Sequence, residues 1–331
     1  MTLASGGGTP GGLVSITDVE AAADRIEGVV VRTPLLPFPE LSEGVGGDVR
    51  LKCENLQRTG SFKARGAANF VAQLTPDERE RGVITYSSGN HGQALALAAR
   101  SMGLRAVVVM PTTAPPVKVK GARRLGAEVI FEGTTSAHRY ERARSMADAE
   151  GLTMAPPFEH PYVIAGQGTV GREIAQDWPD VQLVLAPIGG GGLVSGTALA
   201  LKAMISGVRV VGVEAAGAPT MRAALDAGKP VDLPSVDTIA DGLKPVRVGD
   251  LTFQHAEKYL DDVVVVDDDR IREAAALLLG RRRLVVEFSG AAPVGALLAG
   301  AVETEGLNVA AVLSGGNLDA SHMTDLAGSA L

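Results

Sequence analysis

Three apolar runs in succession are each followed by a helix-like run that closes on glycine, and this alternation constrains the fold more than any other feature. The pairs are "GVITYSSG" with "NHGQALALAARSMG", "LRAVVVMP" with "PPVKVKGARRLG", and "AEVIFEG" with "TTSAHRYERARSMADAEG". Strands that alternate with helices build parallel sheets covered by helices. The alternation starts again at "GQGTVGREIAQDW" and continues to "NVAAVLSGG". We therefore predict an α/β fold of two parallel-sheet domains, with the active site in the cleft between them.

Composition and charge limit the class of protein. The 331 residues are 46% hydrophobic, which is enough for a sizeable core. The net charge of −7 argues against a nucleic-acid partner or a polybasic membrane patch, since both need clustered Lys and Arg. The stretch 181–201 is uncharged and long enough to span a bilayer, but Pro187 and four glycines interrupt it. No membrane segment is therefore predicted.

The cysteine content and the chain ends bear on the compartment. The single cysteine, Cys53, excludes an intrachain disulfide and fits a reducing environment. The N-terminus, "MTLASGGGTPGG", lacks the basic and apolar regions of a signal peptide and is predicted to be a flexible tail. We expect a cytoplasmic protein. Because little sequence follows the last predicted helix, we expect no added regulatory domain and no feedback inhibition by a distal end product.

Four consecutive glycines, Gly189 to Gly192, stand between a predicted strand and a predicted helix. Backbone without side chains lets several N–H groups converge on an anion at the positive end of a helix. A tight turn needs only one or two glycines, so four in a row favour a phosphate cradle. The loop lacks the Gly-Lys-Ser/Thr ending of a P-loop and does not fit G-x-G-x-x-G. Glu214, at the end of the next strand, keeps a nucleotide with a bound ribose open as an alternative.

Lys63 lies in "TGSFKARGAAN", where a helix is about to begin. Taken alone, it is a lysine in the first turn of a helix capped by Ser61. An amine at such a place can also form an imine with an aldehyde that carries a phosphate, and that phosphate could rest on the glycine loop. The lysine and the glycine loop together therefore indicate a covalently held, phosphate-bearing cofactor.

Two further strand ends carry polar groups. The turn "YSSGNHGQA" places around Gly89 the side chains of Ser87, Ser88, Asn90 and His91. Such a turn can hold a carboxylate with the N–H groups of a helix N-terminus, while an amide touches a ring oxygen. In "VLSGGNLD", Ser314 ends a strand and can present a hydroxyl to a ring nitrogen. Each of these stretches, taken singly, is also typical of an ordinary helix cap or turn.

Five motifs in one order resemble the fold-type II pyridoxal phosphate enzymes, in particular the threonine and serine dehydratases and the related serine racemases. The motifs are "SFKARGA", "SSGNHGQA", "IAGQGT", "GGGGL" and "LSGGN", and the similarity extends from about Ile16 to about Leu326. The resemblance implies a tryptophan synthase β-like fold with pyridoxal 5'-phosphate as cofactor. It also implies a large cofactor-binding domain of residues 1–80 and 154–331 and a small mobile domain of residues 81–153.

The resemblance implies a role for each motif residue. Lys63 would hold the cofactor and, once released, remove the α-proton of the substrate. Phe62 would pack beside the cofactor ring, Asn90 would bind its phenolic oxygen, and Ser314 would face its pyridine nitrogen. The phosphate would be bound by Gly189, Gly190, Gly191, Gly192 and Leu193. The substrate carboxylate would be bound by Ser87, Ser88, Gly89, Asn90 and His91.

The hydroxyl of Ser314 favours one reaction over others. A neutral partner need not keep the pyridine nitrogen protonated, so a reaction that promptly expels a β-hydroxyl is favoured over one that needs a long-lived carbanion. We predict β-elimination of L-threonine or L-serine to a 2-keto acid and ammonia. Ser88 keeps amino acid racemisation open, because the racemases carry a serine there that serves as acid or base opposite Lys63. A 3-hydroxyaspartate ammonia-lyase is a further alternative.

The sequence departs from the family pattern in two places. In "VEAAGAPT", Glu214 and the carbonyl of Ala218 fit the family's cation loop, but Thr220 stands where many relatives carry a second acid. One carboxylate is a poor site for a hard cation, so a bound Mg²⁺ or monovalent cation is left open. In "EFSGAA", Phe288 replaces the usual proline, which is expected to alter the pocket wall.

Two other functions are weighed against the dehydratase, and the family resemblance also bears on the oligomeric state. A nicotinamide-dependent oxidoreductase would use Gly189–Gly192 and Glu214 but leaves Lys63 and Ser314 unexplained. A non-catalytic amino-acid sensor would bind substrate without releasing ammonia, and no catalytic residue is missing to support it. Since the family's members are commonly dimers or tetramers, we expect a homo-oligomer that acts on a small amino acid.

Overall fold

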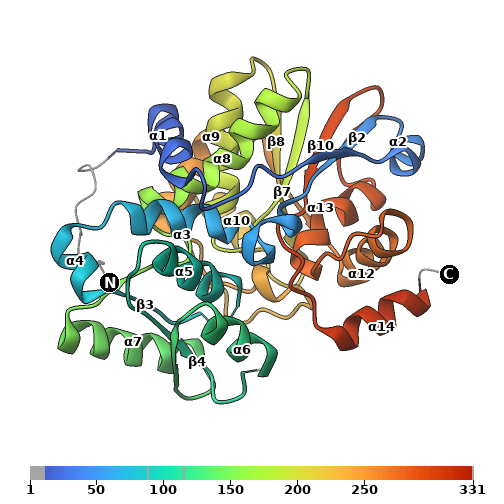
Figure 1. Ribbon diagram of the computed structural model, residues 1–331. Helices are drawn as coiled ribbons and strands as arrows, with labels where there is room; N and C mark the ends of the chain where they lie inside the picture. The colour runs from blue at the N-terminus through green and yellow to red at the C-terminus, as the bar shows by residue number, and fades with distance from the viewer. Residues whose placement is uncertain (1–11, 88, 115, 330–331) are drawn as a thin grey trace.

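The computed structural model describes residues 12–87, 89–114 and 116–329, which fold into two α/β domains (Figure 1). Among these residues, the larger sheet has six strands, in the order β1 (Leu35–Pro37), β2 (Asp48–Lys52), β10 (Asn308–Val312), β7 (Leu183–Pro187), β8 (Arg209–Ala215) and β9 (Asp262–Val266). The smaller sheet has four, in the order β5 (Glu128–Phe131), β4 (Ala106–Met110), β3 (Val83–Thr85) and β6 (Thr153–Met154).

Neighbouring strands are parallel in both sheets, except for the antiparallel pair β1 and β2. The prediction of two parallel-sheet α/β domains is therefore confirmed. The strands of the smaller sheet fall between Val83 and Met154. The predicted domain boundaries at residues 81 and 153, and the mobility of the small domain, stay predictions.

Helices cover both sheets. The described helices of the first half are α1 (Ile16–Ile26), α2 (Pro39–Val45), α3 (Lys63–Ala72), α4 (Pro76–Arg81), α5 (Asn90–Ser101), α6 (Pro116–Arg124), α7 (Ser136–Glu150) and α8 (Pro161–Asp177). Those of the second half are α9 (Gly192–Met204), α10 (Thr220–Ala227), α11 (Asp250–Tyr259), α12 (Asp268–Leu277), α13 (Phe288–Leu298) and α14 (Ala320–Ser329). Shorter helical turns are η1 (Glu54–Leu56), η2 (Arg58–Gly60), η3 (Asp241–Leu243) and η4 (Leu278–Arg282).

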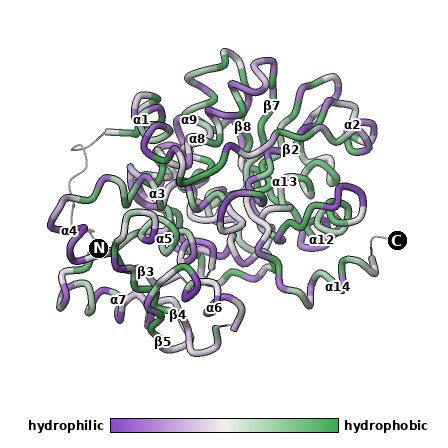
Figure 2. The backbone as a smooth tube through the Cα atoms, in the orientation of Figure 1, coloured by the Kyte–Doolittle hydropathy of each residue, from purple (hydrophilic) through white to green (hydrophobic). Residues whose placement is uncertain are grey.

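The larger sheet is buried on both faces because its central strands are apolar throughout. Side chains alternate between the two faces of a strand. On β7, Leu183 and Leu185 pack in the core that includes α12 and α13, whereas Val184 and Ala186 pack in the core that includes α8 and α9. The hydropathy of the backbone follows the same layering, with apolar segments along β7 and β8 and polar ones on the outer helices (Figure 2).

The described part of the chain begins shortly before α1. Ser15 caps α1 and forms a capping box with Asp18. Residues 1–11 of the predicted N-terminal tail lie outside the described residues. Across the described ranges, no helix combines the length and apolar character that a membrane span requires.

Candidate active site

Lys63 is the first residue of α3, and its Nζ donates a hydrogen bond of 2.7 Å to the carbonyl oxygen of Pro157. The N-cap of α3 is Phe62, without a side-chain capping bond, so Ser61 does not cap this helix. Burial lowers the pKa of Lys63 to about 8, while the charge of Glu287 acts in the opposite direction. An amine with this pKa is far more often neutral near physiological pH than an ordinary lysine, as a nucleophile or base requires.

The segment that carries Lys63 is fixed to the end of β10. The backbone N–H of Phe62 donates to the carbonyl oxygen of Ser314 at 3.0 Å. Ser61 pairs with Gly315 in an isolated antiparallel bridge. Ser314, with 3% of its surface exposed, therefore lies directly beside the turn that enters α3. The ring of Phe62 lies with its centroid 5.0 Å from the Lys63 Nζ.

The glycine loop, Gly189 to Gly192, joins the end of β7 to the start of α9, as predicted. Gly191 is the N-cap, with φ of 95°, a left-handed conformation that favours glycine. A Cβ on Gly189 would lie 2.3 Å from the carbonyl oxygen of Gly242, so a side chain does not fit there. Leu193 lies buried in the first turn of α9.

The amides of the loop fit an anion. Among the described residues, the backbone N–H groups of Gly189, Gly190 and Gly191 donate to no protein acceptor. Buried N–H groups in proteins are nearly always paired. Unpaired donors at the positive end of α9 are the arrangement that a phosphate group satisfies.

The segment Pro157–Glu159 brings the lysine and the loop together. Pro157 accepts the hydrogen bond from Lys63, and the next residue, Phe158, packs on the loop. A Cβ on Gly190 would lie 2.3 Å from the Phe158 ring, and one on Gly192 would lie 3.0 Å from the Phe158 Cβ. The Lys63 amine and the glycine loop therefore contact two consecutive residues, Pro157 and Phe158, so the two predicted parts of the site lie near each other.

The small domain contributes the turn before α5. Gly89 is the N-cap of α5, and its N–H donates to the Ser87 hydroxyl at 3.3 Å. The Asn90 Nδ2 donates to the Glu287 Oε1 at 2.7 Å, and the Asn90 Oδ1 accepts from the Asn317 Nδ2 at 2.8 Å. The Asn90 side chain thus reaches from α5 to the large domain. Ser88 lies outside the described residues, so its predicted roles stay predictions.

His91 is buried and neutral. Its Nε2 lies 3.0 Å from the carbonyl oxygen of Ala155, which can only accept, so Nε2 carries the proton. Burial and the charge of Lys63 lower the pKa of His91 to about 3. The imidazole therefore fixes the start of α5 to the chain after β6 and carries no charge in the physiological range.

Glu287 is a site residue to which the sequence analysis gave no role. It is the N-cap of α13, and a Cβ on Gly315 would lie 2.4 Å from its Oε1, so the carboxylate stands at the end of β10. Burial raises the pKa of Glu287 to about 7, against the lowering effect of the hydrogen bond from Asn90. The signal in the sequence was an acidic residue directly before a strongly apolar helix.

The predicted cation residues make other contacts. The two oxygens of Glu214 accept from the backbone N–H groups of Met221 at 2.6 Å and Arg222 at 2.9 Å, in the first turn of α10. Burial raises the pKa of Glu214 to about 7 despite these bonds. In the part of the chain that the structure describes, no group of three or more His, Cys, Asp or Glu side chains could hold a metal. A cation at Glu214 and Ala218 stays a prediction.

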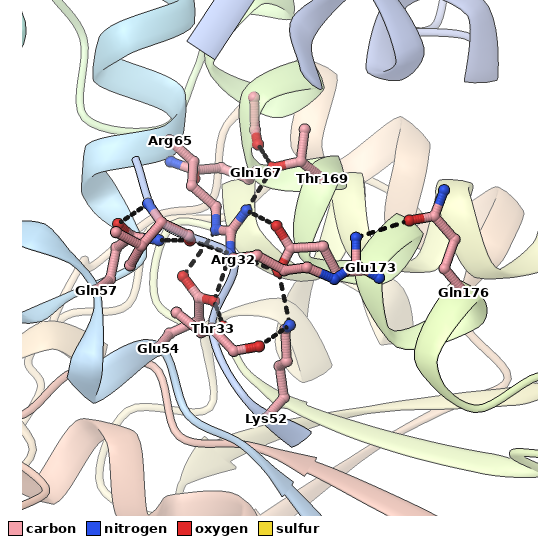
Figure 3. A network of polar contacts seen from close by, with 12 residues as sticks. Arg32, Thr33, Lys52, Glu54, Gln57, Arg65, Gln167, Thr169, Glu173 and Gln176 are labelled. Carbon is pink, nitrogen blue, oxygen red and sulfur yellow. Dashed lines mark hydrogen bonds and ion pairs between the residues drawn. The ribbon is translucent and has the colours of Figure 1, made fainter. Parts of the chain in front are cut away.

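A buried ionic network lies on the other side of α3 (Figure 3). Residues two apart on a helix point in nearly opposite directions, so Arg65 points away from the face that carries Lys63. Arg65 makes two hydrogen bonds of 2.8 Å to Glu54 and bonds of 2.7 and 2.9 Å to Glu173. Lys52 donates to Glu173 at 2.6 Å. The network joins η1, α3, α8 and β2 behind the lysine.

Two α/β domains that meet at a partly buried lysine and a glycine loop with unpaired amides define an enzyme of the pyridoxal phosphate class. The chain belongs to the family described as pyridoxal-phosphate dependent enzyme, whose model matches residues 26–315. This confirms the resemblance found in the sequence, and pyridoxal phosphate is the cofactor.

Three relatives illustrate the similarity. The chain is 43% identical to the L-threonine ammonia-lyase of Thermotoga maritima over 93% of this chain and 76% of that protein. It is 37% identical to the catabolic L-threonine dehydratase TdcB of Escherichia coli K12 over 95% of this chain and 96% of that protein. Its structure superposes on maize serine racemase with a TM-score of 0.91, at 35% identity over 95% of this chain and 96% of that one. The predicted tryptophan synthase β-like fold is confirmed.

Proposed function

We propose that this protein dehydrates a β-hydroxy amino acid, L-threonine or L-serine, to a 2-keto acid and ammonia. The observation that carries the proposal is the position of the Lys63 amine, 2.7 Å from Pro157 and next to the residue that packs on the glycine loop. The relatives named as threonine ammonia-lyase and threonine dehydratase support this reaction.

The residues of the site fit pyridoxal phosphate. The unpaired amides of Gly189 to Gly191 would hold the phosphate, and Lys63 would hold the aldehyde carbon. Phe62 would pack beside the ring, and Ser314 would face its nitrogen. When bound, the cofactor supplies an electron-withdrawing ring that makes the α-proton of an attached amino acid acidic.

Lys63 would act as the base. Once the amino acid displaces it from the cofactor, its amine can take the α-proton, and the pKa of about 8 favours the neutral form that this step needs. Lys63 would then pass this proton to the β-hydroxyl, which would leave as water. The hydrolysis of the enamine product gives the 2-keto acid and ammonia.

Asn90 and the start of α5 would orient the substrate and the ring. One N–H of the Asn90 amide donates to Glu287, which leaves the second N–H for the phenolic oxygen of the cofactor. The N–H groups at the start of α5, with Ser87, Ser88 and Gly89, would bind the substrate carboxylate. His91, being neutral, would position this turn without adding charge.

Racemisation is a second candidate, because the chain superposes on maize serine racemase with a TM-score of 0.91. Ser88 would be the acid or base on the face opposite Lys63. A 3-hydroxyaspartate substrate is the third candidate. The proposal also includes closure of the small domain, residues 81–153, over the substrate, a homo-oligomeric assembly and a cytoplasmic location.

The test is a panel of L- and D-β-hydroxy amino acids, offered to the purified protein with pyridoxal phosphate, with keto acid, ammonia and the chirality of the remaining amino acid measured together. We expect 2-keto acid from L-threonine or L-serine. Inversion without keto acid would instead establish a racemase.

The matched variants are Lys63→Ala and Lys120→Ala, the second at an exposed lysine of α6. Lys63→Ala should lose the visible absorbance band of the bound cofactor and reduce turnover by about 10²–10⁴-fold. Lys120→Ala should match the unmodified chain. A band and a rate that survive Lys63→Ala would remove Lys63 from the mechanism.

A further inference from the structure

Glu159 lies directly after the two residues that touch the lysine and the glycine loop, and it contacts a different helix. Its Oε1 accepts from the backbone N–H of Leu251 at 2.6 Å, and its Oε2 accepts from the N–H of Thr252 at 3.4 Å. Both amides belong to the first turn of α11. Such amides have no partner within their own helix and attract negative charge.

The start of α11 depends on this carboxylate. The N-cap of α11 is Gly249, which has no side chain to cap the helix. A Cβ on Gly249 would lie 1.5 Å from the Glu159 Oε2, so a larger residue would exclude the carboxylate. Glu159, which is 92 positions from Leu251 in the sequence, thus caps α11 as a Ser or Asp at the N-cap does in other helices.

Thr252 carries the contact from α11 to the glycine loop. It is fully buried, and its hydroxyl lies 2.8 Å from the carbonyl oxygen of Gly190 and 3.1 Å from that of Gly249. Its own carbonyl oxygen accepts from the Ser195 hydroxyl at 3.2 Å, in the first turn of α9. Thr252 is therefore held from both sides while it contacts the loop.

The hydrogen bond to Gly190 sets the direction of an amide in the loop. A peptide unit is planar and trans, so its C=O and its N–H point in opposite directions. A Gly190 carbonyl that is fixed on Thr252 turns the N–H of Gly191 away from α11. This N–H is one of the amides that donate to no acceptor among the described residues.

We propose that Glu159 and Thr252 are positioning residues for the phosphate group of the cofactor. Glu159 fixes the start of α11, and Thr252 uses that position to hold the Gly190 carbonyl, which aims the Gly191 N–H at the phosphate. Neither side chain touches the cofactor. The inference rests on the proposed function, in which the glycine loop is the phosphate site.

The test compares the affinities of the full chain for pyridoxal phosphate and for pyridoxal, which has the same aldehyde and no phosphate. The cofactor is removed from the holoenzyme, and each compound is titrated back while its visible band is recorded. The variants are Thr252→Val, which keeps the shape and loses the hydroxyl, Thr252→Ser, which keeps the hydroxyl, and Glu159→Gln. Thermal unfolding of each cofactor-free variant first verifies that it is folded.

We expect Thr252→Val to raise the dissociation constant for pyridoxal phosphate by about 2- to 12-fold, as the loss of one hydrogen bond predicts. Thr252→Ser should stay close to the unmodified chain, and Glu159→Gln should have an effect of similar size to that of Thr252→Val. Pyridoxal affinity should change in none of them. Because the two residues act in one chain of contacts, the double variant should lose less than the product of the two single effects.

Two results would overturn the inference while the phosphate site stands. One is a Thr252→Val variant that binds pyridoxal phosphate as tightly as Thr252→Ser does. The other is an equal loss of affinity for pyridoxal and pyridoxal phosphate, which indicates general loosening. If the unmodified chain itself does not prefer pyridoxal phosphate over pyridoxal, the phosphate site of the proposed function fails, and this inference falls with it. This outcome is distinguishable from the two above because it is seen with the unmodified chain alone.

Discussion

Removal of the Arg65 guanidinium should be among the most destabilising single substitutions in the chain. Arg65 is completely buried and makes four hydrogen bonds of 2.7 to 2.9 Å to Glu54 and Glu173. Replacement by Met keeps most of the volume, leaves Glu173 paired with Lys52, and removes the cation that pairs with Glu54.

The expected cost follows from the uncompensated charge. Removing one partner of a buried ion pair typically costs about 3–5 kcal/mol. The whole stability of a typical domain is about 5–15 kcal/mol, so this loss is a large fraction of it. Arg105 provides a matched control, because it also pairs with two glutamates, at 2.9 and 2.7 Å, but its side chain is 42% exposed. An exposed pair contributes about 0–1 kcal/mol.

The assay is urea unfolding of Arg65→Met and Arg105→Met, followed by the fluorescence of Trp178, the single tryptophan, which caps the C-terminus of α8. We expect Arg65→Met to lose about 3–5 kcal/mol and Arg105→Met less than about 1 kcal/mol. Equal losses in the two variants would refute the argument that burial makes the Arg65 network costly to break.

The pH dependence gives a second check on the same variant. Burial alone would raise the pKa of Glu173, but Arg65 and Lys52 outweigh it and lower the pKa. A carboxylate with a lowered folded pKa stabilises the fold above its unfolded pKa of about 4.3 and loses that contribution as the pH falls through the folded value. The difference between the unmodified chain and Arg65→Met should therefore stay constant from about pH 7 to about pH 5 and shrink only as the pH is lowered below about 4.

Two further predictions concern the site itself. The rate at which the cofactor-free chain binds pyridoxal phosphate should rise with pH and level off above about 8, where the pKa of Lys63 lies. Because the Glu287 charge raises that pKa, Glu287→Gln should move the midpoint of the pH profile to lower pH. A midpoint near the ordinary pKa of lysine would contradict this. Gly190→Ala would place a Cβ 2.3 Å from the Phe158 ring, so we expect a stability loss of about 1–3 kcal/mol and weaker cofactor binding. Gly44→Ala is the control and should change neither, because there is open space around Gly44. Thermal unfolding and cofactor titration of the two alanine variants check this, and equal behaviour would contradict it.

Much of the fold could be predicted because it is encoded locally. The apolar runs that became β3, β4, β5, β7, β8, β9 and β10 each stand between turn signals, and the Gly189–Gly192 loop falls between β7 and α9 as expected. A helix that begins close to Lys63 and the place of Ser314 shortly after β10 were also correct, although the N-cap of α3 is Phe62 and not the predicted Ser61. These features depend on residues that are close together in the sequence.

Features that depend on packing between distant segments could not be predicted from the sequence. The strand β6 has two residues, which is too short for a periodic pattern to show, and β1, with three, was not predicted either. Pro157 and Glu159 belong to a loop, and their roles arise from Lys63 and α11, which only the folded chain brings to them. The partner of Asn90 is likewise 197 positions away, at Glu287.

The ionic network behind Lys63 also orders events during synthesis. Arg65 and Glu173 are 108 residues apart, so a ribosome that adds about 5–20 residues per second needs roughly 5 to 20 s to make the second after the first. Until then the guanidinium of Arg65 lacks one of its two carboxylate partners. Burial of the guanidinium is therefore unfavourable, and α3 is not expected to pack in its final position. All strands of the smaller sheet, Val83 to Met154, emerge in that interval. The nascent chain can therefore complete that sheet first and form the lysine end of the site only after α8 has left the ribosome.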